Sequence, residues 1–233
     1  MQMMRLIVLS LLTMLLVACQ NVPKNTEKSK PAGQELELNN REQYSSAVFS
    51  DMTLIRGKVS AWKLSGSFSY VDPNESGAGR IQWDFKGDLL DSVSLNDFVD
   101  QERVRLIGPI GVGSVELNSQ GRRATLTSGR QEYKGTDAES LLWNIVGWRL
   151  PVSEMRFWLF GMPSPNVKGR FWLNEQGQLQ ALQQSGWEIQ FERYEKTDDL
   201  QQDLPKKITA VHRENKAKVK LVIKRFTVVQ ELR

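Results

Sequence analysis

The sequence predicts a mainly β fold in which about ten antiparallel strands curl around an apolar interior and short helices cover it. Three observations support this prediction. Apolar and polar residues alternate with a period of two over many short segments, turn signals separate these segments, and two short apolar helices are expected near the middle of the chain. Strands that each have one apolar face cannot stay flat in water, so the sheet has to curl into a barrel or be covered.

The first 18 residues have the features of a secretory signal peptide. Arg5 precedes an apolar run of thirteen residues from Leu6 to Ala18, which is shorter than the ~20 residues that a membrane span needs. Leu16-Val17-Ala18-Cys19 resembles the lipobox of bacterial lipoproteins, which implies cleavage before Cys19 and acylation of its thiol and amino group. An ordinary cleaved signal with a chance cysteine beside the cut is the alternative.

Residues 19–33 are expected to form the lipidated N-terminus and a flexible tether, because this stretch is rich in Lys, Asn and Pro and lacks apolar periodicity. Residues 34–233 are then one domain, a length that an all-β architecture commonly reaches. Within it, apolar residues at helical spacing predict one helix from about Gln34 to Arg56, and Gly57 is suited to end it.

Period-two alternation predicts the strands that follow. The clearest segments are Trp62 to Tyr70, Ile81 to Phe85 and Trp187 to Phe191, in which apolar residues share one face. In the last strand the apolar positions change parity between Ile223 and Phe226, which is typical of a β-bulge. Weaker strand candidates lie at residues 92–95, 104–107, 114–118, 124–127 and 169–173.

Two short helices in the middle of the chain are candidates to cover the sheet. Thr136 to Glu139 forms a capping-box pattern before an apolar run that Gly147 is suited to end. A second segment, residues 153–160, ends at Gly161. Apolar residues surround this second segment almost completely, so one side is expected to face the sheet and another side something else.

Charge and residue content exclude several classes of function. The 31 Lys and Arg residues are scattered among 27 Asp and Glu residues, whereas nucleic-acid binding calls for a concentrated basic patch. One histidine, His212, and one cysteine leave no ligand set for a tight zinc or copper site, and no nucleophile-elbow pattern is present. Asp198 and Asp199 are typical of a solvated loop. We therefore expect no enzyme activity, cofactor or metal.

The glycine-rich segment from Gly108 to Gly113 lacks the spacing of a phosphate loop. Its unusual feature is Ile110 between Pro109 and Gly111, since an apolar residue at a turn tip is uncommon. Two interpretations remain. The hairpin can fold back with Ile110 tucked in, or an exposed Ile110 can insert into lipid or a partner.

These features, in their order along the chain, resemble the LolB family of outer-membrane lipoprotein receptors. The matching stretches are residues 16–19, Leu64 to Tyr70, Gly79 to Phe85, Arg105 to Gly111 with Val115 to Leu117, and, most specifically, Gly147 to Pro163. The resemblance implies an unclosed antiparallel β-barrel of about 10–11 strands around an apolar cavity, with helices as a lid.

The resemblance also implies the function and partners. The protein would be anchored in the outer membrane, facing the periplasm, and would accept lipoproteins from a periplasmic carrier of the LolA type. It would hold their acyl chains and place them in outer-membrane lipid. Ile110, in the loop Pro109, Ile110 and Gly111, would protrude and serve delivery. Gln20, directly after Cys19, lacks the aspartate that retains lipoproteins at the inner membrane of enteric bacteria.

We predict that seven apolar residues line the cavity, although ordinary core packing is the alternative for each of them. They are Trp83, Phe85, Leu106, Trp143, Ile145, Trp158 and Trp187. We expect a monomer that does not bind nucleic acid. The alternative function is a lipid-anchored envelope scaffold or binding module without acyl-chain transfer; a lipid-anchored hydrolase ranks third because no site for it is recognisable.

Overall fold

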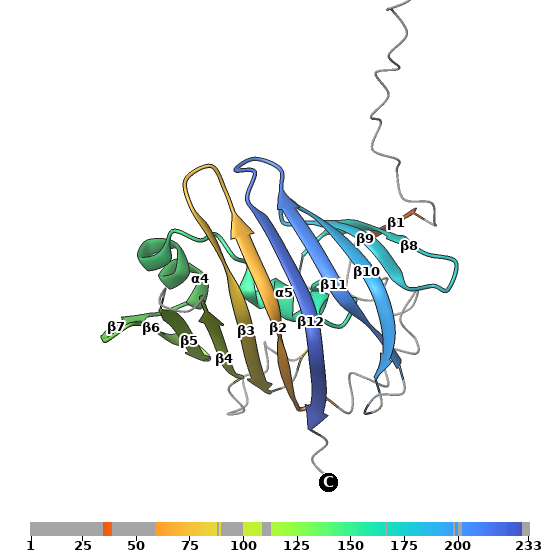
Figure 1. Ribbon diagram of the computed structural model, residues 1–233. Helices are drawn as coiled ribbons and strands as arrows, with labels where there is room; N and C mark the ends of the chain where they lie inside the picture. Colours follow the sequence, from red (N-terminus) through yellow and green to blue (C-terminus); the bar gives the residue numbers. More distant parts are fainter. Residues whose placement is uncertain are drawn as a thin grey trace, which may run out of the picture. The chain divides into compact units, whose positions relative to one another are not determined.

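Figure 1 shows the computed structural model, in which one antiparallel sheet accounts for most of the described residues. The structure describes residues 35–38 (backbone only), 59–87, 89, 100–108, 113–165, 167–197, 199 and 202–229. The chain divides into two units, Met1–Pro31 and Ala32–Arg233, and every described residue belongs to the second. Cys19 and the predicted tether therefore lie outside the described residues.

The sheet has twelve strands among the described residues, slightly more than the expected number, and every pairing is antiparallel. The order across the sheet is β1-β8-β9-β10-β11-β12-β2-β3-β4-β5-β6-β7. Because β1 and β7 stand at the two edges, the sheet is unclosed, as predicted. The strands are β1 (Glu35–Leu38), β2 (Ala61–Val71), β3 (Ser76–Lys86), β4 (Gln101–Ile107), β5 (Ser114–Gln120), β6 (Arg123–Ser128), β7 (Gln131–Gly135), β8 (Gly169–Leu173), β9 (Leu179–Gln184), β10 (Trp187–Thr197), β11 (Gln202–His212) and β12 (Lys218–Val229).

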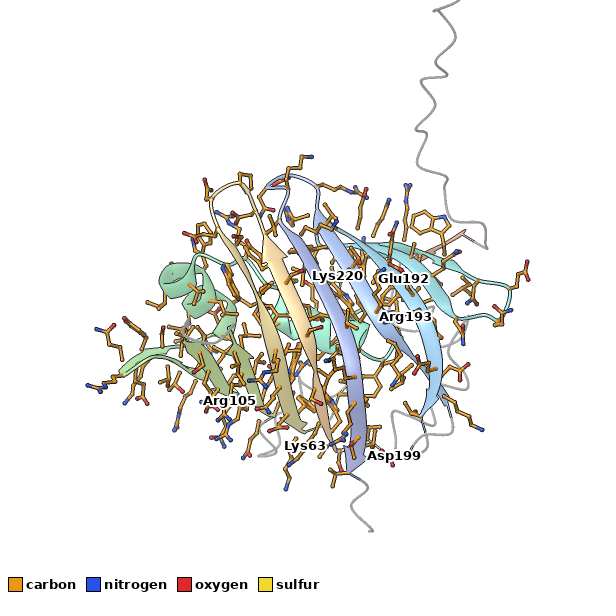
Figure 2. The ribbon with its side chains drawn as sticks, viewed as in Figure 1. Lys63, Arg105, Glu192, Arg193, Asp199 and Lys220 are labelled. Atoms are coloured by element: carbon orange, nitrogen blue, oxygen red, sulfur yellow. The ribbon has the colours of Figure 1, made fainter. Side chains whose placement is uncertain are left out.

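The predicted alternation is confirmed along the central strands. In β2, Trp62 and Tyr70 are fully buried, whereas Lys63 is exposed and Ser65 is half-buried. Figure 2 shows Lys63 and Lys220 on the face of the sheet turned toward the viewer, which is the outer, solvated face. The inner face therefore supplies the apolar core.

The predicted bulge in β12 is also confirmed. The register against β2 shifts between Ile223 and Arg225. Ile223 before the shift and Phe226 after it are both buried, at 5% and 8% exposure. One extra residue therefore restores the inward phase of the apolar residues after the bulge.

Three short helical elements follow β7: α4 (Ala138–Leu141), the π-helix η1 (Leu142–Val146) and α5 (Val152–Trp158). The helix cap differs from the predicted capping box: Asp137, not Thr136, caps α4, and its Oδ1 accepts a hydrogen bond from Ser140 N at 2.7 Å. Glu139 instead accepts bonds from the backbone N and the Oγ of Ser153, at 3.1 and 2.6 Å. The two helical segments are thereby joined.

Glycine ends both helical segments, as predicted. Gly147 follows η1 with φ of 79°, and Gly161 follows α5 with φ of 64°. A residue with a Cβ would be strained in this left-handed conformation. α5 lies behind β2, β3 and β12 in Figure 1, against the inner face of the sheet.

The predicted helix from Gln34 to Arg56 is wrong at its start. Residues 35–38 form β1, which pairs antiparallel with β8, with Leu36 opposite Phe171. The Glu-Leu-Glu-Leu stretch alternates with a period of two, and β8 offers it unpaired backbone groups, so local helical spacing does not decide the outcome.

Residues 39–58 and the strand candidate at 92–95 lie outside the described residues. Within the described part of the chain, no helix has the length and apolar content to cross a bilayer.

Candidate functional site

A small apolar cavity lies between the inner face of the sheet and the helical segment. Strands β2, β3, β4, β5 and β12 form its wall, and η1, the 147–151 connection and α5 cover it. The wall includes Ile81, Trp83 and Leu106, and the cover includes Val152 and Met155 of α5. The side chains that line it are apolar except for the hydroxyl of Tyr70 and the indole N–H of Trp83, so the cavity suits an apolar ligand.

The cavity measures about 20 Å³, which is room for roughly one water molecule. Val152 and Met155 of α5 and Leu142 of η1 occupy the space that a larger ligand would need. In this structure the cover is therefore packed onto the wall.

The predicted cavity residues fall into three groups. Trp83 and Leu106 line the cavity, and their contact with acyl chains stays a prediction. Phe85, Trp158 and Trp187 are buried but lie elsewhere in the core. Phe85 stacks on Trp62 with ring centroids 5.6 Å apart, and Trp158 meets Trp187 edge to face at 6.3 Å.

Trp143 and Ile145 do not line the cavity, contrary to the sequence-based expectation. They are 43% and 36% exposed. The apolar run from Leu141 to Val146 covers all sides of a short helical turn, and only Leu141 and Leu142 are buried. Arg149 covers the Trp143 ring, with its Cζ 3.9 Å from the ring centroid.

Several cavity residues were not predicted, although the sequence contains a signal for them. Val152 and Met155 lie three residues apart on α5, the spacing that places two side chains on one helix face. Ile81 and Val104 lie two positions from Trp83 and Leu106 on the same strands. Extending the period-two phase of each strand would have found them.

Tyr70, one of the residues that line the cavity, is held by hydrogen bonds. Its hydroxyl donates to Asp72 Oδ2 at 2.6 Å and accepts from Arg149 N at 3.3 Å. Burial, helped by the bond to Asp72, raises the pKa of Tyr70 to about 12. Trp148 stacks on the Tyr70 ring at 5.2 Å, so the β2–β3 hairpin is held against the segment that enters α5.

A cluster of charged side chains lies beside the cavity wall. Glu102 Oε1 accepts a hydrogen bond from Trp83 Nε1 at 2.9 Å, and Ser119 Oγ donates to Glu102 Oε2 at 3.4 Å. Arg156 Nη1, from α5, donates to Asp100 Oδ2 at 3.0 Å. Burial raises the pKa of Glu102 to about 7, because it outweighs the opposing effects of the Arg156 charge and of the hydrogen bonds.

The loop Pro109, Ile110 and Gly111 lies outside the described residues, so the role of Ile110 stays a prediction. Its two ends are close together, since Gly108 N donates to Gly113 O at 3.1 Å. No group of three or more His, Cys, Asp or Glu residues that could hold a metal ion is present among the residues that the structure describes.

Comparisons with known proteins agree with this architecture. The family model described as "Outer membrane lipoprotein LolB" matches residues 60–226. The chain is 32% identical to the outer-membrane lipoprotein LolB of Pseudomonas paraeruginosa over 138 residues, which are 59% of this chain and 62% of that relative. It is also 32% identical to LolB of Marinobacter nauticus over 159 residues, 68% of this chain and 72% of that relative. The chain thus spans somewhat under two thirds of the Pseudomonas relative.

Solved structures share the fold at low sequence identity. A putative outer-membrane lipoprotein-sorting protein domain from Vibrio parahaemolyticus has a TM-score of 0.56 at 8% identity, covering 83% of this chain and 95% of that one. A LolA superfamily protein from Nitrosomonas europaea has a TM-score of 0.51 at 8% identity, covering 81% and 95%. Because the family model covers most of the chain, including the strands and helices that enclose the cavity, the chain belongs to the LolB family of outer-membrane lipoproteins.

Proposed function

We propose that this protein is a receptor anchored in the outer membrane and facing the periplasm, which accepts lipoproteins from a carrier of the LolA type and inserts them into the membrane. The observation that supports this most is the apolar cavity between the sheet and α5, in a chain of the LolB family. The acyl chains of the transferred lipoprotein would occupy this cavity.

The physical need for such a cavity follows from the cost of exposing acyl chains. Each methylene that leaves an apolar environment for water costs ~0.8 kcal/mol, so transfer requires an apolar path throughout. No bond has to form or break, and the protein acts as a receptor and not as an enzyme. Direction follows if the receptor binds acyl chains more tightly than the carrier does and the bilayer more tightly still.

Acyl chains need the cover to move. A cavity of about 20 Å³ holds no chain of methylenes, and Val152 and Met155 of α5 are the side chains that close it. Displacement of α5 would turn the apolar wall formed by Ile81, Trp83 and Leu106 into an open groove. The near-complete filling of the closed cavity is also the one observation that favours the alternative, a lipid-anchored scaffold with a packed sheet.

The N-terminal features complete the proposal. Residues 1–18 are the signal peptide, lipidated Cys19 is the anchor, residues 19–33 are the tether and residues 34–233 are the binding domain. Several acyl chains on one cysteine would hold the protein on the membrane essentially permanently. The protein works as a monomer, and the Ile110 loop contacts the outer-membrane lipid during delivery.

The test uses the full-length chain in liposomes and a lipidated peptide with a photo-crosslinking group at the end of one acyl chain. Val104→Thr adds a hydroxyl to the cavity wall at nearly constant volume and is expected to weaken cross-linking about tenfold, because the buried hydroxyl opposes an apolar ligand. Val228→Thr is the matched control, since Val228 is buried in β12 outside the cavity. Absence of cross-linking to the unmodified chain would support the scaffold instead.

A further inference from the structure

Arg156 connects the cover to the sheet through a nearly buried ion pair. It lies in α5, and its Nη1 is 3.0 Å from Oδ2 of Asp100, the residue that directly precedes β4. The two side chains are only 11% and 18% exposed. The ion pair of Arg105 with Glu116, by contrast, lies on the outer face of the sheet and joins two neighbouring strands. The pair with Asp100 joins a helix to a strand.

A second carboxylate interacts with the same guanidinium. Glu102 lies on the inner face of β4, in phase with Val104 and Leu106, and the positive charge of Arg156 favours its ionised form. Its oxygens also accept bonds from Trp83 Nε1 and Ser119 Oγ. The positive charge of Arg156 therefore offsets the negative charge of two carboxylates next to the cavity wall, Asp100 and Glu102.

The surroundings of Arg156 are apolar. Its Cζ lies 5.4 Å from the ring centroids of both Phe85 and Phe157, and its Nε has no hydrogen-bond partner among the described residues. Moving α5 away would take the charge of Arg156 from Asp100 and Glu102, two carboxylates that are largely screened from water. Leaving one partner of a buried pair uncompensated is costly, even where the intact pair adds little net stability.

α5 carries both this cation and the side chains that fill the cavity. Val152 and Met155 lie on the same seven-residue helix as Arg156. We propose that Arg156 is a positioning residue, and that its ion pair with Asp100, together with its positive charge near Glu102, forms a latch that holds α5 closed over the cavity. The latch sets how readily acyl chains enter. This inference rests on the proposed function, because it assigns the step that opens the cavity.

The first measurement separates opening of the cover from unfolding. In the full-length chain carrying Cys19→Ala, a cysteine at Leu117 reports exposure of the cavity wall, and a cysteine at Ile189 reports exposure of the core of β10. Arg156→Gln is expected to increase the rate of thiol modification at position 117 about tenfold, the effect of losing one charged hydrogen bond. The rate at position 189 should change much less.

Matched variants show whether the charge contact is responsible. Arg156→Lys keeps the cation and should restore most of the slow rate at position 117, whereas Asp100→Asn, which keeps the side-chain volume, should resemble Arg156→Gln. Arg105→Gln removes an ion pair from the outer face and should leave the rate at position 117 unchanged. Equal acceleration at positions 117 and 189 in Arg156→Gln would overturn the latch.

The second measurement is acyl-chain uptake by the full-length chain with Cys19 intact, anchored in liposomes. Arg156→Gln should take up the photo-crosslinking peptide about tenfold faster than the unmodified chain, since a ligand that binds the open state benefits when that state is more populated. Cross-linking of the unmodified chain without acceleration in Arg156→Gln would overturn the latch alone. Absence of cross-linking in both chains would overturn the receptor function itself.

Discussion

The two halves of the sheet differ in what their inner faces meet. On β9 and β10, Leu182 and Ile189 are completely or almost completely buried, and Trp187 packs edge to face on Trp158. On β3 and β4, equally apolar side chains face a cavity and a helix held by charges. We call these the packed half and the cavity half. β10 in the packed half and β3 in the cavity half show the same period-two alternation of apolar residues.

Buried polar groups show the difference most clearly. In the packed half, Gln184 is almost fully buried and uncharged: its side chain accepts from Ser164 N and donates to Ser164 O and Val167 O, at 2.9, 2.9 and 2.7 Å. In the cavity half, buried Arg156 is charged and pairs with Asp100, and burial raises the pKa of Glu102 to about 7. The Gln184 amide has all these hydrogen bonds only in one packed arrangement, which it therefore stabilises. The charge of Arg156, in contrast, moves away from its carboxylates when α5 moves.

The largest effect is expected from truncation in the packed half. Leu182→Ala should lower the free energy of unfolding by about 3–5 kcal/mol, because rigid neighbours cannot fill the space. Met155→Ala in the cavity half should cost about 2 kcal/mol, because its site already adjoins a cavity and its helix can shift. Denaturant unfolding measures both values, and equal losses would remove the distinction between the halves.

Glu102 should make the stability of the cavity half depend on pH. Its folded pKa of about 7 lies above its ordinary value of 4.5, so the folded state keeps a proton that the unfolded state has lost. The contribution is fully present below pH 4.5 and is lost as the pH rises through 7, by at most about 3 kcal/mol. Asp100, just before β4, and Arg156, on α5, act on this group, so their charges modulate the loss.

Thermal unfolding of the chain and of Glu102→Gln between pH 5 and 8 measures this dependence. The unmodified chain should lose stability across this range relative to the variant. A parallel pH dependence in both proteins would show that Glu102 does not carry it.

In the packed half, removal of the buried side chain of Gln184 should lower stability equally at every pH. Gln184→Ala leaves the backbone groups of Ser164 and Val167 without partners and should cost about 1–3 kcal/mol, with no dependence on pH. Gln190→Ala, on the exposed face of β10, is the control and should be nearly neutral. A pH-dependent loss in Gln184→Ala would contradict the assignment of an uncharged network.

The smallest effect is expected at the outer face, where the two halves should not differ. Arg213→Ala breaks an ion pair with Glu188 in which both side chains are 50% exposed. The expected loss is about 0.5 kcal/mol and should shrink as salt is added, because exposed pairs are weak and screened. Urea unfolding at two salt concentrations measures it, and a loss above 2 kcal/mol would contradict this expectation.

Much of the fold could be predicted because its signals are local. The parity change between Ile223 and Phe226 predicted the bulge, and Gly147 predicted the end of the first helical segment. The positions of Trp143 and Ile145 could not be predicted in this way. A short turn with apolar residues all round has no preferred face, so its orientation depends on tertiary contacts, such as those of the preceding helix α4 with β6 and β7.

By itself, the sequence determined the LolB resemblance and, for strands such as β2, β3 and β10, the inward face of the strand, because period-two alternation is a property of neighbouring residues. It did not predict β1, β7 or β9. Only the tertiary structure decided which inward faces meet packed side chains and which meet a cavity. That difference depends on residues distant in the chain, such as Asp100 and Arg156, which are 56 positions apart. No local pattern encodes their contact, because it forms only when α5 folds back across the sheet.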